Sequence, residues 1–96
     1  MDCRVALCQM RPQLGVIDSN LKAHHAWLDQ SIAAGAQLAV FPELSLTGYF
    51  LRDLTQEIAM RLDDPRILEL IARSHVCSIV FGLVEESSDH RFYNSV

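Results

Sequence analysis

Leu38 to Tyr49 reads LAVFPELSLTGY, and this stretch shapes the interpretation of the rest of the chain. Its first four residues form a continuous apolar run, which is typical of a strand buried on both faces in a sheet covered by helices. Pro42 has no N–H to donate to a neighbouring strand, so it ends the run. Glu43 is therefore predicted to emerge just beyond the carboxyl end of a buried strand, where open α/β sheets bind their ligands.

The neighbours of Glu43 favour a functional role for this carboxylate. Hydroxyl and apolar side chains surround it in sequence, at Ser45, Thr47, Tyr49, Leu44, Leu46 and Phe50. Such residues could form a partly dry cleft, in which the pKa of a carboxyl group rises toward the working range of a general base. The alternative is a carboxylate that only caps or solvates a connecting loop. Position and composition leave both interpretations open.

Residues Phe41 to Tyr49, FPELSLTGY, resemble the first catalytic motif of the nitrilase, or carbon–nitrogen hydrolase, superfamily. Shorter segments match the same family in the same order along the chain: Val5 to Met10 at its first strand, Asn20-Leu21 at a helix start, Gly35-Ala36 at the helix exit, Phe81-Gly82 at the third strand, and Tyr93-Asn94-Ser95 at the strand after it. The resemblance implies an α/β fold, the N-terminal portion of an α-β-β-α sandwich.

The same resemblance implies catalysis by a glutamate, a lysine and a cysteine, with Glu43 as the general base. In the family the lysine and the cysteine lie well downstream, so only the glutamate of the triad is expected in these 96 residues. The chain alone is expected to be inactive, because the thiolate nucleophile forms the covalent intermediate. Tyr49 is implied to lie beside the substrate as part of the pocket wall. A core tyrosine that fixes the loop is the alternative.

The main elements predicted along the chain follow the order β-α-β-α-β-β, with one further short helix before the second long one, in a single, incomplete domain, residues 1–96. They are a strand over Arg4 to Met10, a loop to Asp18, a helix capped by Asp18 or Ser19 that runs to about Ala34 and stops at Gly35, the strand before Pro42, a short helix over Thr55 to Leu62, a helix from Pro65 to about Ser74, a strand over Val76 to Val84, and the start of a strand at Phe92. The last strand and an uncovered sheet face predict poor solubility unless further chain or a partner covers them.

Apolar periodicity predicts which helix faces are buried. In the first long helix the face expected on the sheet is Leu21, His25, Leu28 and Ile32. A second line, Ala23, Trp27, Ser31 and Ala34, is either the edge of one wide apolar face or a subunit interface. The faces predicted for the two later helices are Ile58, Ala59 and Leu62, and Ile67, Leu68 and Ile71. Asp63-Asp64-Pro65 predicts an acidic cap with proline at the first helical position.

Composition excludes several functional classes. Half of the residues are hydrophobic and 21% are charged, which is ordinary for a globular protein. The net charge of −4 comes without any basic stripe, so no nucleic-acid partner is expected. No run is long enough for a membrane span. An odd count of three cysteines and the lack of a signal-peptide pattern favour the cytoplasm.

Other catalytic or ligand-binding groups find little support. Cys8 and Cys77 lie in apolar runs and Cys3 opens the chain, so none resembles the nucleophile of the family, and Lys22 is not its catalytic lysine. His24 and His25 point about 100° apart on a helix and cannot share a metal ion. No glycine-rich phosphate loop is present, so neither a metal nor a cofactor is expected.

The function implied by the resemblance is hydrolysis of a non-peptide C–N bond in a small carboxamide, with a nitrile as the less favoured substrate and a homo-oligomer as the expected assembly. Residues Gly48 to Leu54 are also similar to the glutamine-hydrolysing domain of NAD synthetases, although those relatives usually have proline where this chain has Phe50. A non-catalytic remnant or binding module is a third hypothesis.

Overall fold

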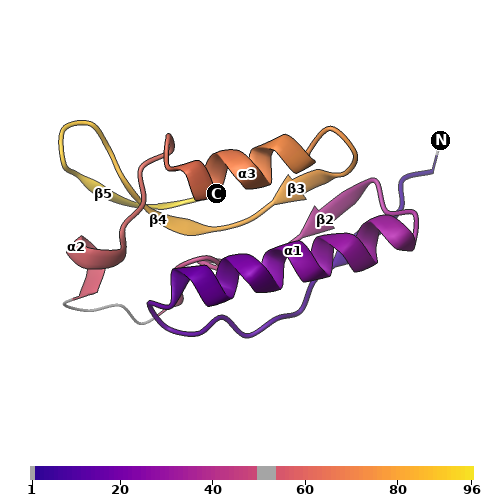
Figure 1. The fold of residues 1–96 in the computed structure, drawn as a ribbon, viewed down its shortest axis with the longest axis horizontal. Helices are drawn as coiled ribbons and strands as arrows, with labels where there is room; N and C mark the ends of the chain where they lie inside the picture. Colours follow the sequence, from indigo (N-terminus) through magenta and orange to yellow (C-terminus); the bar gives the residue numbers. More distant parts are fainter. Residues whose placement is uncertain (1, 50–53) are drawn as a thin grey trace.

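The computed structural model describes residues 2–49 and 54–96, and in these ranges the chain folds as a mixed α/β structure (Figure 1). The elements are β1 (Val5–Leu7), α1 (Ile17–Ala33), β2 (Leu38–Val40), α2 (Thr55–Ile58), α3 (Pro65–Arg73), β3 (Ser78–Val80), β4 (Leu83–Glu86) and β5 (Phe92–Ser95). The predicted α/β class is confirmed.

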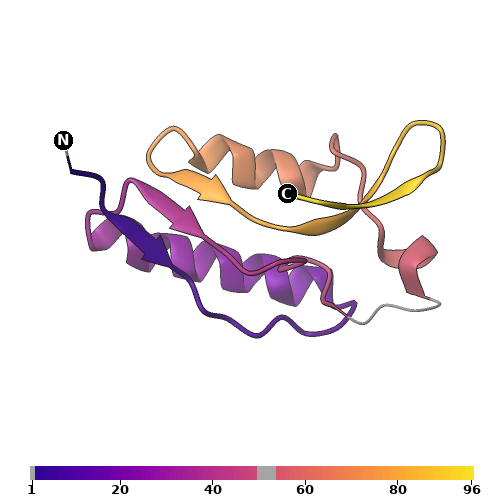
Figure 2. The ribbon, with the colours of Figure 1, turned by 180° about the vertical axis from the view of Figure 1, so that it is seen from behind.

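The first three strands form a parallel sheet in the order β1-β2-β3. Ala39 at the centre of β2 pairs with Ala6 and Ile79 and is completely buried, because these residues face the helices. Figures 1 and 2 show α1 on one side of β1 and β2, in front of them in one view and behind them in the other. Ion pairs from α3 to α1, such as Arg73 with Asp29, place α3 in the same helical layer.

The predicted single strand over Val76 to Val84 is wrong, since two strands occupy this segment. Phe81-Gly82 separates β3, which ends the parallel sheet, from β4, which pairs antiparallel with β5 in a second sheet. At this junction Phe81 is half-buried and Gly82 is buried. An apolar run cannot reveal this change of partner, because both strands bury apolar side chains.

Helix α1 ends as predicted but begins differently. Gly35 has a φ of +79°, the left-handed conformation that closes a helix at little cost in glycine. The N-cap is Val16, with no capping hydrogen bond from its side chain, so the prediction of Asp18 or Ser19 as the cap is wrong. Asp18 instead lies in the first turn, where its charge complements the helix dipole.

The face of α1 that packs on the sheet is also rotated from the predicted one. The buried residues are Ile17, Asn20, His24, Leu28 and Ser31, three of which are polar. Of the predicted face only Leu28 is fully buried, and His25 is half-buried. Trp27 is partly buried and packs against the core, as the edge of a wide face would. Periodicity missed this face because two of its polar members, Asn20 and His24, hydrogen-bond to loops that lie elsewhere in the sequence.

Helix α3 has the predicted cap. Asp64 is the N-cap, and its Oδ1 accepts a hydrogen bond of 2.9 Å from the Arg66 backbone N–H, with Pro65 next in the chain. Its buried face is Ile67 and Leu70, whereas the predicted face residues Leu68 and Ile71 are about half exposed. The short helix α2 ends at Ile58, so Leu62 is exposed and does not join it.

The core lies between the helical layer and the sheet, and it includes the fully buried side chains of Leu28, Leu46 and Leu70. On the opposite face of the sheet Val5 and Leu7 are 44% and 70% exposed, and no helix of the described residues covers them. Across residues 2–49 and 54–96, no helix is long and apolar enough to cross a membrane.

Candidate active site at the Glu43 elbow

Glu43 lies at a sharp bend that follows β2, and we call residues 42–48 the elbow. Phe41 still bonds to the neighbouring strand, because its N–H donates to the Val80 carbonyl at 2.8 Å. Glu43 is exposed, and the next residue, Leu44, is buried with a φ of 51°. A left-handed conformation in a bulky residue costs on the order of 1 kcal/mol, and such strain is concentrated at functional sites. The bend turns the chain into the core directly after the carboxylate.

Gly82 clamps the elbow from the neighbouring strand junction. Its N–H donates to Ser45 Oγ at 3.2 Å, and its carbonyl accepts from the Leu46 N–H at 2.9 Å. A Cβ on residue 82 would lie 2.4 Å from the Leu44 nitrogen and 3.2 Å from the Glu43 carbonyl carbon. Only glycine allows this approach, so the backbone of residue 82 sets where the elbow can lie.

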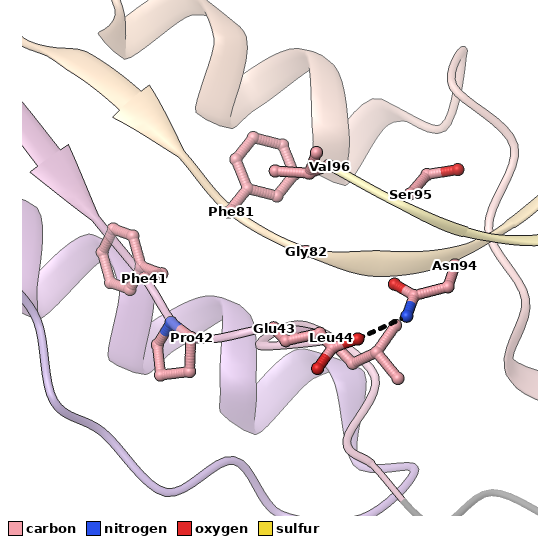
Figure 3. A pocket seen from close by; sticks show the side chains of 9 residues that line it. All are labelled: Phe41, Pro42, Glu43, Leu44, Phe81, Gly82, Asn94, Ser95 and Val96. Atoms are coloured by element: carbon pink, nitrogen blue, oxygen red, sulfur yellow. Dashed lines mark hydrogen bonds between the residues drawn. The ribbon is translucent and has the colours of Figure 1, made fainter.

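The Glu43 carboxylate is held by two polar side chains. Asn94 on β5 donates from Nδ2 to Glu43 Oε1 at 2.6 Å, a short bond of the charge-assisted kind (Figure 3). Glu43 also raises the pKa of the Tyr49 phenol, first through a side-chain hydrogen bond and then through its negative charge. Both partners restrict the orientation of the carboxylate.

A cavity of about 290 Å³ opens beside Glu43. Its walls are Phe41, Pro42, Glu43, Leu44, Phe81, Gly82, Asn94, Ser95 and Val96, as Figure 3 shows. Most of this surface is apolar, and its polar groups are a carboxylate, a carboxamide and a hydroxyl. A mainly apolar cavity with a few convergent polar groups is typical of a small-molecule site.

Several predicted neighbours of Glu43 do not line this site. Ser45, Leu46 and Thr47 are completely buried, and Thr47 Oγ1 accepts a hydrogen bond of 3.3 Å from the Val84 N–H inside the fold. The predicted dry cleft built from these residues is therefore wrong, because their polar atoms satisfy backbone groups at the β3–β4 junction. Leu44 does line the cavity. Phe50, the last predicted wall residue, lies outside the described residues.

Tyr49 lies beside the carboxylate and is 58% exposed. It is therefore not a core tyrosine, which was the alternative to a residue near the substrate. Among the described residues the cavity wall is formed by other side chains, so Tyr49 lies beside Glu43 but is not part of this wall. Of the segment Gly48 to Leu54, on which the likeness to NAD synthetases was based, residues 50–53 lie outside the described ranges.

Asn94 and Gly82 were expected only as parts of strands, and their contacts with the elbow were not predicted. The signal that could have found Asn94 is an amide in a predicted strand, between Tyr93 and Ser95. Such a signal gives no partner, because Asn94 and Glu43 are 51 positions apart. The antiparallel pairing of β4 with β5 brings them together.

The remaining candidate groups lie away from the elbow or inside the core. Cys8 and Cys77 are buried and Cys3 is exposed, and all three are free thiols. Lys22 is exposed on α1. Within the described ranges, no cluster of three or more histidine, cysteine, aspartate or glutamate residues could hold a metal ion.

Comparison with known proteins gives concordant matches. Residues 4–96 match the family described as Carbon-nitrogen hydrolase. The chain is 29% identical over 92 residues to a glutamine-dependent NAD(+) synthetase from Acinetobacter baylyi, covering 96% of this chain and 17% of that protein. It is 35% identical over 97 residues to a nitrilase from Pyrococcus abyssi, covering 96% of this chain and 37% of that protein.

A solved structure is also similar to this chain. It is a glutamine-dependent NAD+ synthetase from Acinetobacter baumannii in complex with adenosine diphosphate, with a TM-score of 0.74 and 34% identity. The match covers 94% of this chain and 17% of that one. The chain therefore spans only a minor part of the length of these relatives.

Proposed function

This chain belongs to the carbon-nitrogen hydrolase family, and from that membership we propose that it forms the part of a hydrolase that carries the general base, Glu43. The substrate we propose is a small carboxamide, with a nitrile as the less favoured choice. The observation that carries the proposal is the Glu43 carboxylate at a strained elbow, oriented by Asn94 at the mouth of a cavity.

The proposed chemistry follows from what an oriented carboxylate can do. In the mechanism implied by the family resemblance, Glu43 takes the proton of a cysteine thiol and later activates the water that hydrolyses the covalent intermediate. That work requires an ionised carboxylate within hydrogen-bond distance of each proton donor in turn. Hydrogen bonds with Asn94 and Tyr49 orient the carboxylate for this work. Among the described residues, no cysteine or lysine lines the cavity with Glu43.

Tyr49 is proposed to contact the substrate. Its exposed ring stands beside Glu43, so a bound carboxamide could pack on it while meeting the carboxylate.

The three free cysteines support a cytoplasmic location as part of the same proposal, since reducing compartments keep thiols unpaired. A homo-oligomer remains the proposed assembly.

L-Glutamine is a second, more specific candidate for the carboxamide. The observation that favours it is the likeness of both a sequence relative and a solved structure to glutamine-dependent NAD synthetases. The nitrilase relative favours no particular amide. Assay of the intact protein with L-glutamine and with a simple aliphatic amide such as acetamide separates the two candidates.

The test of the proposal is Glu43→Gln in the intact protein. Glu43 is exposed, so the fold and the melting temperature should be unchanged. Amide hydrolysis should fall by at least about 10²-fold, the usual loss on removing a positioned base. The measurement is kcat for ammonia release from L-glutamine and acetamide.

Glu57→Gln is the matched control, because Glu57 is an exposed carboxylate on α2. It should leave turnover unchanged. If Glu43→Gln hydrolyses amides as fast as the unaltered protein, Glu43 is not the base. If the intact protein hydrolyses neither amide nor nitrile, the non-catalytic hypothesis replaces the proposal.

A further inference from the structure

His24 forms a buried bridge between α1 and the elbow. Its side chain is completely buried. Nδ1 lies 2.6 Å from the Asn20 carbonyl oxygen, and Nε2 lies 2.8 Å from Ser45 Oγ. Ser45 is two residues beyond Glu43, so the imidazole contacts the elbow close in the chain to the proposed base.

The partners of His24 fix the direction of each hydrogen bond. The Asn20 carbonyl can only accept, so the Nδ1 atom carries the proton. Burial lowers the pKa of His24, which favours the neutral ring. Nε2 of the neutral ring then accepts from the Ser45 hydroxyl, whose oxygen accepts in turn from the Gly82 N–H at 3.2 Å. In this bridge Nδ1 donates, Nε2 accepts, and the Ser45 hydroxyl both donates and accepts.

The ring faces of His24 also contact the walls of the cavity. The imidazole stacks on Phe41 with ring centroids 4.3 Å apart and planes 24° apart. Phe81 meets it edge-on, with the centroids 6.4 Å apart. Phe41 and Phe81 both line the cavity beside Glu43. One buried side chain therefore contacts the end of β2, the elbow and the β3–β4 junction.

We propose that His24 is a positioning residue for Glu43: acting through Ser45, it holds the elbow against Gly82 and so aims the carboxylate at Asn94 and the cavity. This inference rests on the proposed function of Glu43. An apolar residue would fill the same space without desolvating a polar ring, so packing alone does not account for histidine here. The two hydrogen bonds of the ring account for the histidine at this position.

Variants of His24 can separate its two hydrogen bonds. In His24→Asn, the amide NH2 can replace Nδ1 as donor to the Asn20 carbonyl, but nothing reaches Ser45. In His24→Gln, the longer side chain brings an acceptor to the Nε2 position and restores the bond to Ser45. Ser45→Ala removes the hydroxyl and leaves the ring in place. His25→Gln is the matched control, because His25 is the adjacent histidine and contacts Glu69 and Arg73 on α3 rather than the elbow.

The expected result in the intact protein is a loss of kcat of about 10²-fold for His24→Asn and Ser45→Ala, the scale of a small misplacement of a catalytic group. KM for L-glutamine or acetamide should be unchanged, because the group that fails acts in the transition state. His24→Gln should recover most of the activity. His25→Gln should match the unaltered protein.

A second readout does not depend on activity. The Asn94 side-chain N–H bonded to the Glu43 carboxylate should give a downfield proton signal in NMR spectra of the intact, 15N-labelled protein, and Glu43→Gln should shift it. His24→Asn and Ser45→Ala should shift it likewise, whereas His24→Gln and His25→Gln should not. If Glu43→Gln retains full turnover, the proposed function of Glu43 fails. The Asn94 side-chain signal alone then decides whether His24 positions Glu43.

The inference is overturned if His24→Asn and Ser45→Ala lower the melting temperature but leave both kcat and the Asn94 signal unchanged, because His24 is then only a core residue. Failure of His24→Gln to restore the signal would also contradict it. Should His24→Asn not fold, Ser45→Ala decides between the two roles, since it removes a single oxygen atom.

Discussion

At the scale of single residues, the position of Glu43 depends on two backbone features. Leu44 adopts a φ of 51°, and Gly82 has no side chain where the elbow passes. The strained conformation persists because hydrogen bonds to Gly82 fix Ser45 and Leu46, the two residues that follow Leu44. The direction of the carboxylate thus depends on the backbone of its neighbours in the elbow and of Gly82.

Gly82→Ala should therefore move the elbow. The added methyl group cannot lie 2.4 Å from the Leu44 nitrogen, so the backbone of one segment must shift. We expect a loss of about 1–3 kcal/mol in the free energy of unfolding, as for overpacked cores. Turnover should fall together with stability, measured by urea denaturation and by amide hydrolysis.

Gly35→Ala is the matched control for this prediction. Gly35 has a φ of +79°, so alanine there is also strained, but Gly35 precedes β2, whereas the cavity lies beyond the other end of that strand. This variant should lose stability and keep its turnover under conditions where it is folded. Equal turnover for Gly82→Ala and the unaltered protein would show that Gly82 does not position the elbow.

At the scale of elements, the two long helices differ in how well the sequence predicts them. The cap of α3 is local: Asp64, Pro65 and Arg66 are adjacent, and the hydrogen bond forms within this segment. The buried face of α1 is not local, because Asn20 and His24 bond to Leu46 and Ser45 of the elbow. Asn20 Nδ2 donates to the Leu46 carbonyl at 2.8 Å and to the Gln13 carbonyl at 2.7 Å.

Asp64→Ala should destabilise α3 by about 1 kcal/mol, the usual cost of losing an N-cap. The Asp64 side chain also binds the Arg66 guanidinium, which lowers the pKa of its carboxyl group. The midpoint of urea denaturation at neutral pH measures the change. Asp64→Asn should retain most of the stability, since asparagine caps equally well.

Asp63→Ala is the control, because Asp63 is exposed and precedes the cap residue. Its denaturation midpoint should be unchanged. A loss for Asp63→Ala as large as that for Asp64→Ala would mean that acidic charge, and not the cap geometry, stabilises α3.

At the scale of the whole molecule, the main feature is the uncovered face of the parallel sheet. Helices α1 and α3 are linked by Arg66–Asp18 and Arg73–Asp29 ion pairs and form one layer. Figure 2 shows β1 and β2 in front of α1, without a helix over them among the described residues. The exposed Val5 and Leu7 on that face belong to a surface of the kind that associates.

The 96-residue chain alone is therefore expected to self-associate, and Leu7→Lys should reduce this association. Leu7 is 70% exposed, so lysine should cost little stability while it interrupts the apolar face. Sedimentation velocity and binding of a hydrophobic dye measure the outcome. Val76→Lys is the control, since Val76 is 69% exposed but lies in the turn after α3.

Equal association of the Leu7→Lys and Val76→Lys variants would show that the uncovered sheet face does not drive it. A chain that is monomeric at all concentrations would contradict the prediction outright. Both variants should melt within a few degrees of the unaltered chain, because single surface substitutions change stability little.

The sequence by itself determined the α/β class, the strand before Pro42, the emergence of Glu43 beyond it, the end of α1 at Gly35 and the cap of α3. Its prediction that this strand is buried on both faces is wrong for the described residues, because only Ala39 of β2 is fully buried and no helix among these residues covers the other face of the sheet. These features depend on neighbouring residues, whose apolar runs, missing N–H groups and short polar side chains act within a few positions. The family resemblance rested on the same local motif.

Only the tertiary structure decided the contacts of Glu43 with Asn94, the clamp at Gly82, the bridge of His24 to Ser45 and the change of sheet between β3 and β4. Each joins segments that are far apart in the chain, and the geometry of the join depends on how the strands pair. The sequence does not identify the hydrogen-bond partner of a polar residue such as His24 or Asn94, because hydrogen bonding depends on position in space.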